Sequence, residues 1–273
     1  MISLYTAAQD NTQVAPRYGR TTGKLPALSY GQGEDRLGGA KMGYIDTNVL
    51  LKIVDSVKGM YKVQLSKWHS AYLDQSFIKA DSALPVKKPF YVTGSFVAKG
   101  DSLFDYVNMS LPEKLPYKTW MEIGPSRIMI DLFGVQSNTN WVTQLSSLKE
   151  VKNVYYNQVE DDLVRVIVEL KHQQHWGYSI GYKGNTLQLR VKRQPPILDL
   201  RKLTIAIDAG HGGTNAGSTG PLLNTSEKEY TLRFAKALEK SLKKLKVKKV
   251  IMTRNSDSSF DNKDRILWLQ EQN

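Results

Sequence analysis

Short stretches of alternating apolar and polar residues mark the first part of the chain, the period-two pattern of strands with one buried face. Residues 60–65, Met-Tyr-Lys-Val-Gln-Leu, give the clearest example, and residues 71–73 continue it. A turn that contains Gly31 separates these stretches from an earlier one. Several short strands within about seventy residues predict a small β-barrel over residues 12–84.

Residues 85–195 are also rich in strand-forming residues. The three best candidate strands contain many β-branched residues and are bounded by glycines; they are 126–133, 164–170 and 186–191. Periodicity alone is typical of either a β-sandwich or a β-barrel. Consecutive prolines at Pro195 and Pro196 resist both helix and central strand, so they predict a domain boundary.

The pattern changes from Leu203 onward. Residues 203–208 form a short, nearly all-apolar run, which is typical of a strand buried on both faces of an α/β sheet. A glycine-rich loop follows, and Ser226 with Glu229 forms the sequence of a helical capping box. The helix after it carries an apolar stripe at helical spacing, formed by Phe234, Leu238, Leu242 and Leu245.

A second strand is predicted at 247–253, and a second helix at 261–270. Strand, helix, strand and helix in succession build a mainly parallel sheet. The predicted fold class is therefore multidomain, with two β-rich N-terminal domains followed by the incomplete start of an α/β domain over 201–273. Residues 203–273 number only 71 and make a small sheet with an open edge, which is only marginally stable alone.

Composition excludes several classes of protein. A hydrophobic fraction of 41% supports packed cores, and the absence of cysteine excludes disulfides, thiolate zinc ligands and cysteine nucleophiles. No run approaches the roughly 20 apolar residues of a membrane-spanning helix, so we expect no membrane span. Residues 1–5 do not resemble the start of a signal peptide.

The formal net charge is +12, with fourteen basic and eight acidic residues in 201–273. Most of this excess is one lysine cluster, formed by Lys236, Lys240, Lys243, Lys244, Lys246, Lys248 and Lys249. Such a cluster suits nucleic acid, anionic lipid or a carboxylate-bearing wall polymer. A solvated helix face that runs into a strand edge is the simpler and preferred explanation, and the charge alone selects no partner.

The strongest chemical signal is the segment 208–213, Asp-Ala-Gly-His-Gly-Gly, directly after the predicted buried strand. Ligands of open α/β sheets collect at the carboxyl ends of the strands, where this loop must lie. Glycines around His211 leave its imidazole little steric cover, and Glu227 can return to the same edge at the helix start. Imidazole and carboxylate without sulfur suit a catalytic zinc site with an open coordination position.

Simpler interpretations exist for each residue. An acid such as Glu227 is favoured in a first helical turn by the helix dipole alone. Asp208 could orient His211 or could simply end a strand, and Arg254 and Arg265 are expected to be structural. The glycines of the loop lack the order of a nucleotide-binding motif, so we expect no nucleotide there.

Residues 207–213, the glycines that follow, Glu227-Lys228 and Thr253-Arg254 together resemble the zinc-dependent N-acetylmuramoyl-L-alanine amidases (type-3 family). The resemblance implies that His211 and Glu227 are ligands of Zn²⁺. It also implies hydrolysis of the amide between N-acetylmuramic acid and L-alanine in peptidoglycan. Zinc would polarise the carbonyl and lower the pKa of water, and a glutamate base would transfer the proton to the leaving amine.

The chain departs from this family after the second predicted helix. The family has a second histidine ligand after the next strand and a catalytic glutamate near the end of the domain. No histidine follows Glu227 here, and His69, His172 and His175 belong to the β-rich segments. We therefore expect an incomplete amidase domain without hydrolytic turnover, and the catalytic and substrate-binding residues stay unassigned.

The β-rich segments carry looser resemblances. The Pro-Arg segment at 16–17, the Leu-Ser-Tyr-Gly turn at 28–31 and the strands near 61–63 and 71–73 resemble a bacterial SH3-like domain. Residues 154–193 are similar to the AMIN domains that precede cell-wall amidases, which makes 85–195 an AMIN-like domain. Both resemblances imply binding to the cell wall.

Two hypotheses therefore stay open. The first is a peptidoglycan hydrolase present as an inactive fragment, and the second is a non-catalytic peptidoglycan-binding protein with a vestigial amidase segment. Both make peptidoglycan the partner rather than nucleic acid, and both place the protein in the cell envelope after export.

Overall fold

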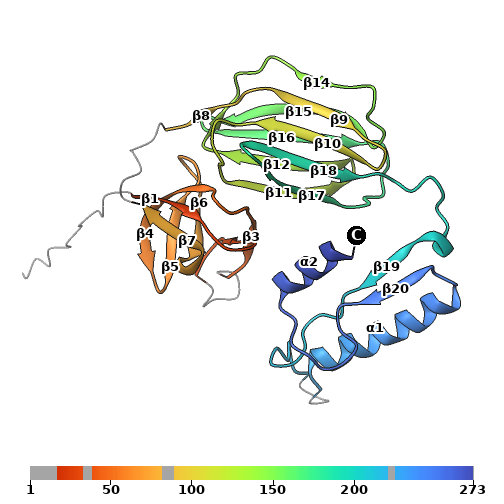
Figure 1. The fold of residues 1–273 in the computed structure, drawn as a ribbon. Coiled ribbons are helices and arrows are strands. Elements are labelled where there is room, and N and C mark those ends of the chain that lie inside the picture. Colours follow the sequence, from red (N-terminus) through yellow and green to blue (C-terminus); the bar gives the residue numbers. More distant parts are fainter. Residues whose placement is uncertain (1–16, 33–38, 82–88, 221–224, 273) are drawn as a thin grey trace, which may run out of the picture. The chain divides into compact units, whose positions relative to one another are not determined.

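The structure is a computed structural model that describes residues 17–32, 39–81, 89–220 and 225–272 (Figure 1). The chain divides into two compact units, one that ends at Gln194 and one that begins at Pro195. Strands make up the first unit, and the described α-helices all lie in the second. The predicted fold class, a β-rich N-terminal region followed by the start of an α/β domain, is confirmed. Residues 1–5 and 12–16, used in the predictions above, lie outside the described residues.

The N-terminal β-domain, residues 17–81, is one seven-stranded antiparallel sheet with strand order β3-β2-β6-β5-β4-β1-β7. Alternation places Leu28, Val63 and Leu73 in its core, where each is fully buried. Its elements are β1 (Arg17–Thr21), β2 (Ala27–Ser29), β3 (Lys41–Tyr44), β4 (Leu50–Val57), β5 (Met60–Gln64), β6 (Ser70–Asp74), the 3-10 turn η1 (Gln75–Phe77) and β7 (Ile78–Asp81). The period-two stretches at 60–65 and 71–73 correspond to β5 and β6.

Residues 91–192 form two facing sheets, with strand orders β14-β9-β10-β18-β17 and β11-β12-β16-β15. The sheets share one core, in which the Phe96 and Tyr156 rings meet edge to face at 5.6 Å between centroids. The strands are β8 (Tyr91–Val92), β9 (Phe96–Gly100), β10 (Phe104–Ser110), β11 (Tyr117–Ile123), β12 (Ser126–Phe133), β13 (Val135–Gln136), β14 (Val142–Gln144), β15 (Val151–Glu160), β16 (Leu163–Leu170), β17 (Tyr178–Lys183) and β18 (Thr186–Lys192). Of the two architectures left open by the sequence, the sandwich is the observed one.

A buried carboxylate on β10 connects the two sheets of the sandwich by hydrogen bonds. Asp105 on β10 is fully buried, and its Oδ2 accepts hydrogen bonds from the backbone N–H groups of residues 149–151 at 2.7–2.9 Å. Its Oδ1 accepts from Nε and Nη2 of Arg193 at 2.8 and 2.6 Å. The charge is therefore both paired and hydrogen-bonded, as burial of a carboxylate requires.

The second unit contains η2 (Leu200–Lys202), β19 (Thr204–Ile207), α1 (Glu227–Lys244), β20 (Lys249–Met252) and α2 (Asn262–Glu271). The two strands are parallel, with Ile207 opposite Met252, and α1 connects them. Its core is small: Ile207, Ala209 and Ala235 are buried, with Leu242, Val250 and Met252 packed against them. The predicted order of strand, helix, strand and helix is thus observed.

The apolar stripe on α1 has the predicted helical spacing, but most of it is not covered by the described residues. Phe234, Leu238 and Leu245 are 73%, 49% and 58% exposed, and only Leu242 packs on the core. The seven clustered lysines are all exposed, as a solvated face requires. Among the described residues, no helix is both long enough and apolar enough to cross a membrane.

The predicted capping box is only partly formed. Ser226 is the N-cap of α1, as expected, but its side chain does not accept a hydrogen bond from the first turn. Instead the Ser226 hydroxyl donates to Oε1 of Glu229 at 3.1 Å. The Ser226 hydroxyl thus acts as a donor to the carboxylate rather than as an acceptor from the backbone. The backbone N–H of Glu229 donates to the Ser226 carbonyl instead, at 3.1 Å.

Candidate metal centre

The loop after β19 turns sharply at His211. This residue has φ +59°, and the next two glycines, Gly212 and Gly213, have φ +132° and +54°. A left-handed φ is uncommon for a residue with a side chain and indicates a local constraint. Gly212 and Asn215 then exchange backbone hydrogen bonds of 2.8 and 3.0 Å, which closes a tight turn. The loop therefore fixes the direction in which the imidazole leaves the backbone.

His211 and Glu227 converge, as the sequence predicted. Nε2 of His211 lies 3.3 Å from Oε2 of Glu227, the first residue of α1. The side chains are 31% and 43% exposed, so the pair is open to solvent. The backbone N–H of Ser218 donates to the same carboxylate oxygen at 3.0 Å, and the Glu227 N–H donates to the Ser218 carbonyl at 2.8 Å. These two bonds fix the helix start against the loop.

Asn215 holds the other side of the imidazole, a role that the sequence analysis missed. Its Oδ1 lies 3.0 Å from Nδ1 of His211 and also accepts from the Gly217 N–H at 3.2 Å. An amide oxygen can only accept, so this contact assigns the proton to Nδ1 and leaves the Nε2 lone pair facing Glu227. That tautomer is the one a metal ligand needs.

The local electrostatics favour the ionised form of Glu227. The backbone N–H of Ser218 donates to this carboxyl and thereby lowers its pKa below the ordinary value. An ionised carboxylate beside an unprotonated imidazole nitrogen is a donor pair for a cation.

Gly217 packs directly against this pair. A Cβ added at Gly217 would lie 2.7 Å from both Cβ and Oε2 of Glu227 and 3.0 Å from Cδ2 of His211. Its φ is +68°, so a side chain would also be strained there. The close approach of the two donor side chains therefore depends on a glycine at 217.

Two buried arginines, Arg254 and Arg265, form hydrogen bonds to the backbone of the His211 loop, which is the structural role predicted for them. Arg254 donates to the carbonyls of Ala209 and Gly210, each at 3.0 Å, and Arg265 donates to those of Ala209 and His211 at 2.7 and 2.8 Å. Burial, and then the charge of Arg265, lower the pKa of Arg254. The guanidinium groups thus donate hydrogen bonds to loop carbonyls that have no partner in a β-sheet.

Asp208 belongs to this support rather than to the imidazole. Its Oδ1 accepts hydrogen bonds from Arg265 and from the Thr253 hydroxyl, the latter at 2.7 Å. Of the two interpretations left open for Asp208, the orientation of His211 is therefore not observed. Asn215 has that contact instead.

The pair fits two positions of a zinc site. Zn–N and Zn–O bonds of about 2.0–2.1 Å in a tetrahedron place two ligand atoms about 3.3 Å apart, which equals the observed Nε2–Oε2 separation. Within the described parts of the chain, no group of three or more His, Asp or Glu side chains is arranged to hold a metal. The remaining histidines lie in the first unit, where His69, His172 and His175 bond to Ser66, Glu150 and Ser126 respectively.

The chain matches two family models. Residues 205–273 match the N-acetylmuramoyl-L-alanine amidase model, and residues 98–192 match the AMIN domain model. The resemblances to these two families stated above are therefore confirmed.

Curated relatives agree with these matches. A probable cell wall amidase, LytH, of Staphylococcus saprophyticus is 37% identical over 90 residues, which are 33% of this chain and 30% of that protein. The N-acetylmuramoyl-L-alanine amidase AmiC of Escherichia coli is 24% identical over 213 residues, 63% of this chain and 51% of that protein. A putative N-acetylmuramoyl-L-alanine amidase of Buchnera aphidicola is 42% identical over 65 residues, 24% of this chain and 27% of that protein. The chain thus spans at most about half the length of these relatives, and the two matched segments, 98–192 and 205–273, follow one another along it.

Proposed function

We propose that residues 201–273 supply the first two zinc ligands of an N-acetylmuramoyl-L-alanine amidase, a peptidoglycan hydrolase. The reaction is hydrolysis of the amide between N-acetylmuramic acid and the L-alanine of the stem peptide. The observation that carries this proposal is the 3.3 Å approach of His211 Nε2 to Glu227 Oε2 inside the segment that matches the amidase model.

Each residue of the site has a separate task. A bound Zn²⁺ ion would supply a Lewis acid that polarises the scissile carbonyl and lowers the pKa of water. His211 offers the Nε2 lone pair, and Asn215 keeps the proton on Nδ1. Glu227 stays ionised because the Ser218 N–H stabilises its carboxylate. Gly217 leaves the space in which the two donors approach each other.

For the chain as given, we propose metal binding without turnover. Hydrolysis of an amide needs a base for the attacking water and an acid for the leaving amine. No third histidine, aspartate or glutamate of the described residues joins His211 and Glu227 in a metal-binding group. These residues alone therefore provide a place for the ion but not the complete proton-transfer machinery.

A second candidate is a non-catalytic peptidoglycan-binding protein that retains the two donors. The observation in its favour is the AMIN match, which covers 98–192, together with a candidate metal site to which the described part of the chain contributes two donors. Under both candidates the partner is peptidoglycan, and the protein works in the cell envelope after export. We also propose the SH3-like assignment of residues 12–84 on the order of their strands and turns.

Zinc titration of the whole chain tests the proposal. Competition with a chromophoric chelator should show one zinc site that His211→Ala and Glu227→Gln each weaken by about 10-fold or more. Glu229→Gln is the matched control, because it removes a charge from the same helical turn without touching the pair. His172→Ala controls for binding by other histidines. Equal zinc affinity in the wild type and in both site variants would refute the metal site.

Measurement of stem-peptide release separates the two candidates. Zinc-loaded chain should release no stem peptide from purified peptidoglycan, because no third histidine, aspartate or glutamate of the described residues joins the pair in a metal-binding group. Zinc-dependent release that both site variants abolish would contradict the proposed inactivity and exclude the second candidate.

A further inference from the structure

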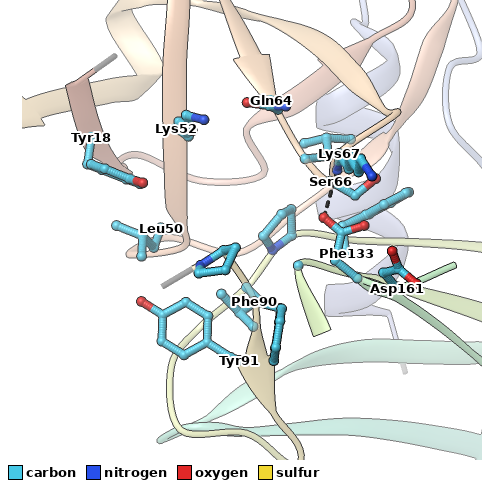
Figure 2. Close-up of a pocket in the computed structure, with 16 residues that line it drawn as sticks. Tyr18, Leu50, Lys52, Gln64, Ser66, Lys67, Phe90, Tyr91, Phe133 and Asp161 are labelled. Carbon is cyan, nitrogen blue, oxygen red and sulfur yellow. Dashed lines mark hydrogen bonds between the residues drawn. The ribbon is translucent and has the colours of Figure 1, made fainter. Parts of the chain in front are cut away.

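A cavity lies within the first unit. Its volume is about 510 Å³, within the range of small-ligand sites. Residues from the N-terminal β-domain line one side, and residues 89–91, 115–116, 133–134 and 161–162 line the other (Figure 2). Neither β-domain alone would form this cavity.

A cross-strand row forms one wall. Tyr18 on β1 is in register with Lys52 on β4, and Lys52 is in register with Gln64 on β5. Leu50 lies two residues before Lys52, so its side chain lies on the same face of the sheet. Figure 2 shows these side chains around the cavity, opposite Phe90 and Tyr91. This wall therefore carries the polar ends of Lys52, Tyr18 and Gln64 beside the apolar side chain of Leu50.

The rest of the lining is mainly apolar. Leu65, Leu115 and Phe133 are at most 4% exposed and make a packed floor. Phe90 and Tyr91 add aromatic faces. A polar sugar chain would leave its hydroxyls without partners against such a floor, whereas small aliphatic side chains would be covered.

Two carboxylates lie at the far end of the cavity. Asp161 is exposed at the rim, and Asp162 is 7% exposed. Oδ2 of Asp162 accepts from the Lys67 N–H at 2.7 Å, whereas its Oδ1 is buried without a hydrogen-bond partner among the described residues. The cavity thus has the Lys52 side chain on the β4 wall and, at the other end, two carboxylates beside the exposed Lys67.

Contacts between the two β-domains fix the walls. Arg20 forms two hydrogen bonds to the Glu113 carboxylate at 3.0 and 2.9 Å, and the Leu50 N–H donates to the Lys114 carbonyl at 2.8 Å. The bond from Lys67 to Asp162 closes the opposite side. A cavity held on both sides is preorganised, which lowers the entropy lost on binding.

We propose that this cavity binds a short peptide with small apolar side chains, its carboxylate at Lys52 and an ammonium at Asp161 and Asp162. A peptidoglycan stem peptide has this chemistry: alanine methyl groups, free carboxylates and amines. The inference rests on the proposed contact with peptidoglycan, and it assigns that contact to the peptide rather than to the glycan.

Calorimetric titration of the full chain with the tetrapeptide L-Ala-γ-D-Glu-L-Lys-D-Ala tests this inference. Lys52→Glu reverses the charge on the β4 wall, and Gln64→Trp fills the cavity from its rim. Each should weaken peptide binding by about 10-fold or more. The matched control is Lys99→Glu, which makes the same charge change at an exposed position outside the lining. Circular dichroism confirms that each variant is folded, and the methyl NMR signals of Leu50, Leu65 and Leu115 should shift with peptide.

The outcomes separate this inference from the proposed function. Peptide binding that Lys52→Glu and Gln64→Trp weaken and Lys99→Glu does not supports the cavity. If the chain cosediments with insoluble peptidoglycan but does not bind the tetrapeptide, the cavity inference fails and the wall contact stands. Equal peptide binding by all folded variants, or binding of chitotetraose in place of the peptide, also overturns it. Failure of both assays overturns the wall contact as well.

Discussion

Substitution of Gly217 by alanine tests whether the metal pair depends on close packing of the loop. The new Cβ would lie 2.7 Å from two atoms of Glu227, and an ordinary contact is at least 3.4 Å, so the carboxylate or the loop must move by 3.4 − 2.7 = 0.7 Å. Zinc sites tolerate deviations of about 0.2 Å in their bond lengths. We therefore expect Gly217→Ala to weaken zinc binding by about 10–100-fold, the loss that follows when support of a ligand is removed.

Gly220→Ala is the matched control in the same loop. Among the described residues, the one atom near its added Cβ would be the Thr225 carbonyl oxygen at 3.8 Å, which is an ordinary contact. The alanine at 217 also adopts a left-handed φ, which costs about 1–2 kcal/mol of stability, so thermal unfolding is measured beside the chelator competition. Wild-type zinc affinity in a folded Gly217→Ala variant would refute the packing argument, and an equal loss in Gly220→Ala would show a general effect on the loop.

Three further predictions follow from the described contacts. Asn215→Ala should weaken zinc binding by about 10-fold because the tautomer of His211 loses its support, whereas Asn215→Asp should retain binding; equal affinity in all three proteins would contradict this. Asp105→Ala should lower the free energy of unfolding by about 3–5 kcal/mol in urea titration because it leaves the Arg193 charge buried without its partner, and a loss below about 1 kcal/mol would be inconsistent with the buried pair. The Glu227 carboxyl should titrate by NMR below 4.5, so its contribution to stability is present above that pH and is lost as the pH falls through the lower folded value; a midpoint at or above 4.5 would oppose the assigned hydrogen bond.

The sequence predicted the convergence of His211 and Glu227 because both positions follow from simple rules. A short apolar strand ends four residues before the histidine, and a serine N-cap places the glutamate at the start of a helix; the prediction that this strand is buried on both faces is wrong, because only Ile207 of it is buried. Parallel connections bring these two ends to one edge of a sheet. Element type and order in the second unit followed in the same way.

The support of the pair could not be predicted in this manner. Asn215 bonds to His211 because of left-handed φ values at 211 to 213, and nothing in the residue types specifies those angles. Its only sequence signal is an amide side chain four residues after the histidine in a glycine-rich loop. The exposure of Phe234 was also missed, because helical spacing shows which residues share a face but not whether a neighbouring element covers it.

The two buried arginines have a consequence for how the site matures. Both donate hydrogen bonds to the backbone of the histidine loop from far along the chain. Arg254 follows its partner Gly210 by 44 residues, and Arg265 follows its partner His211 by 54 residues. During synthesis the imidazole therefore emerges well before the cations that set its backbone, and this non-local closure must await the later strand and helix. Acquisition of a metal ion would then report that the nascent segment has folded at least as far as α2.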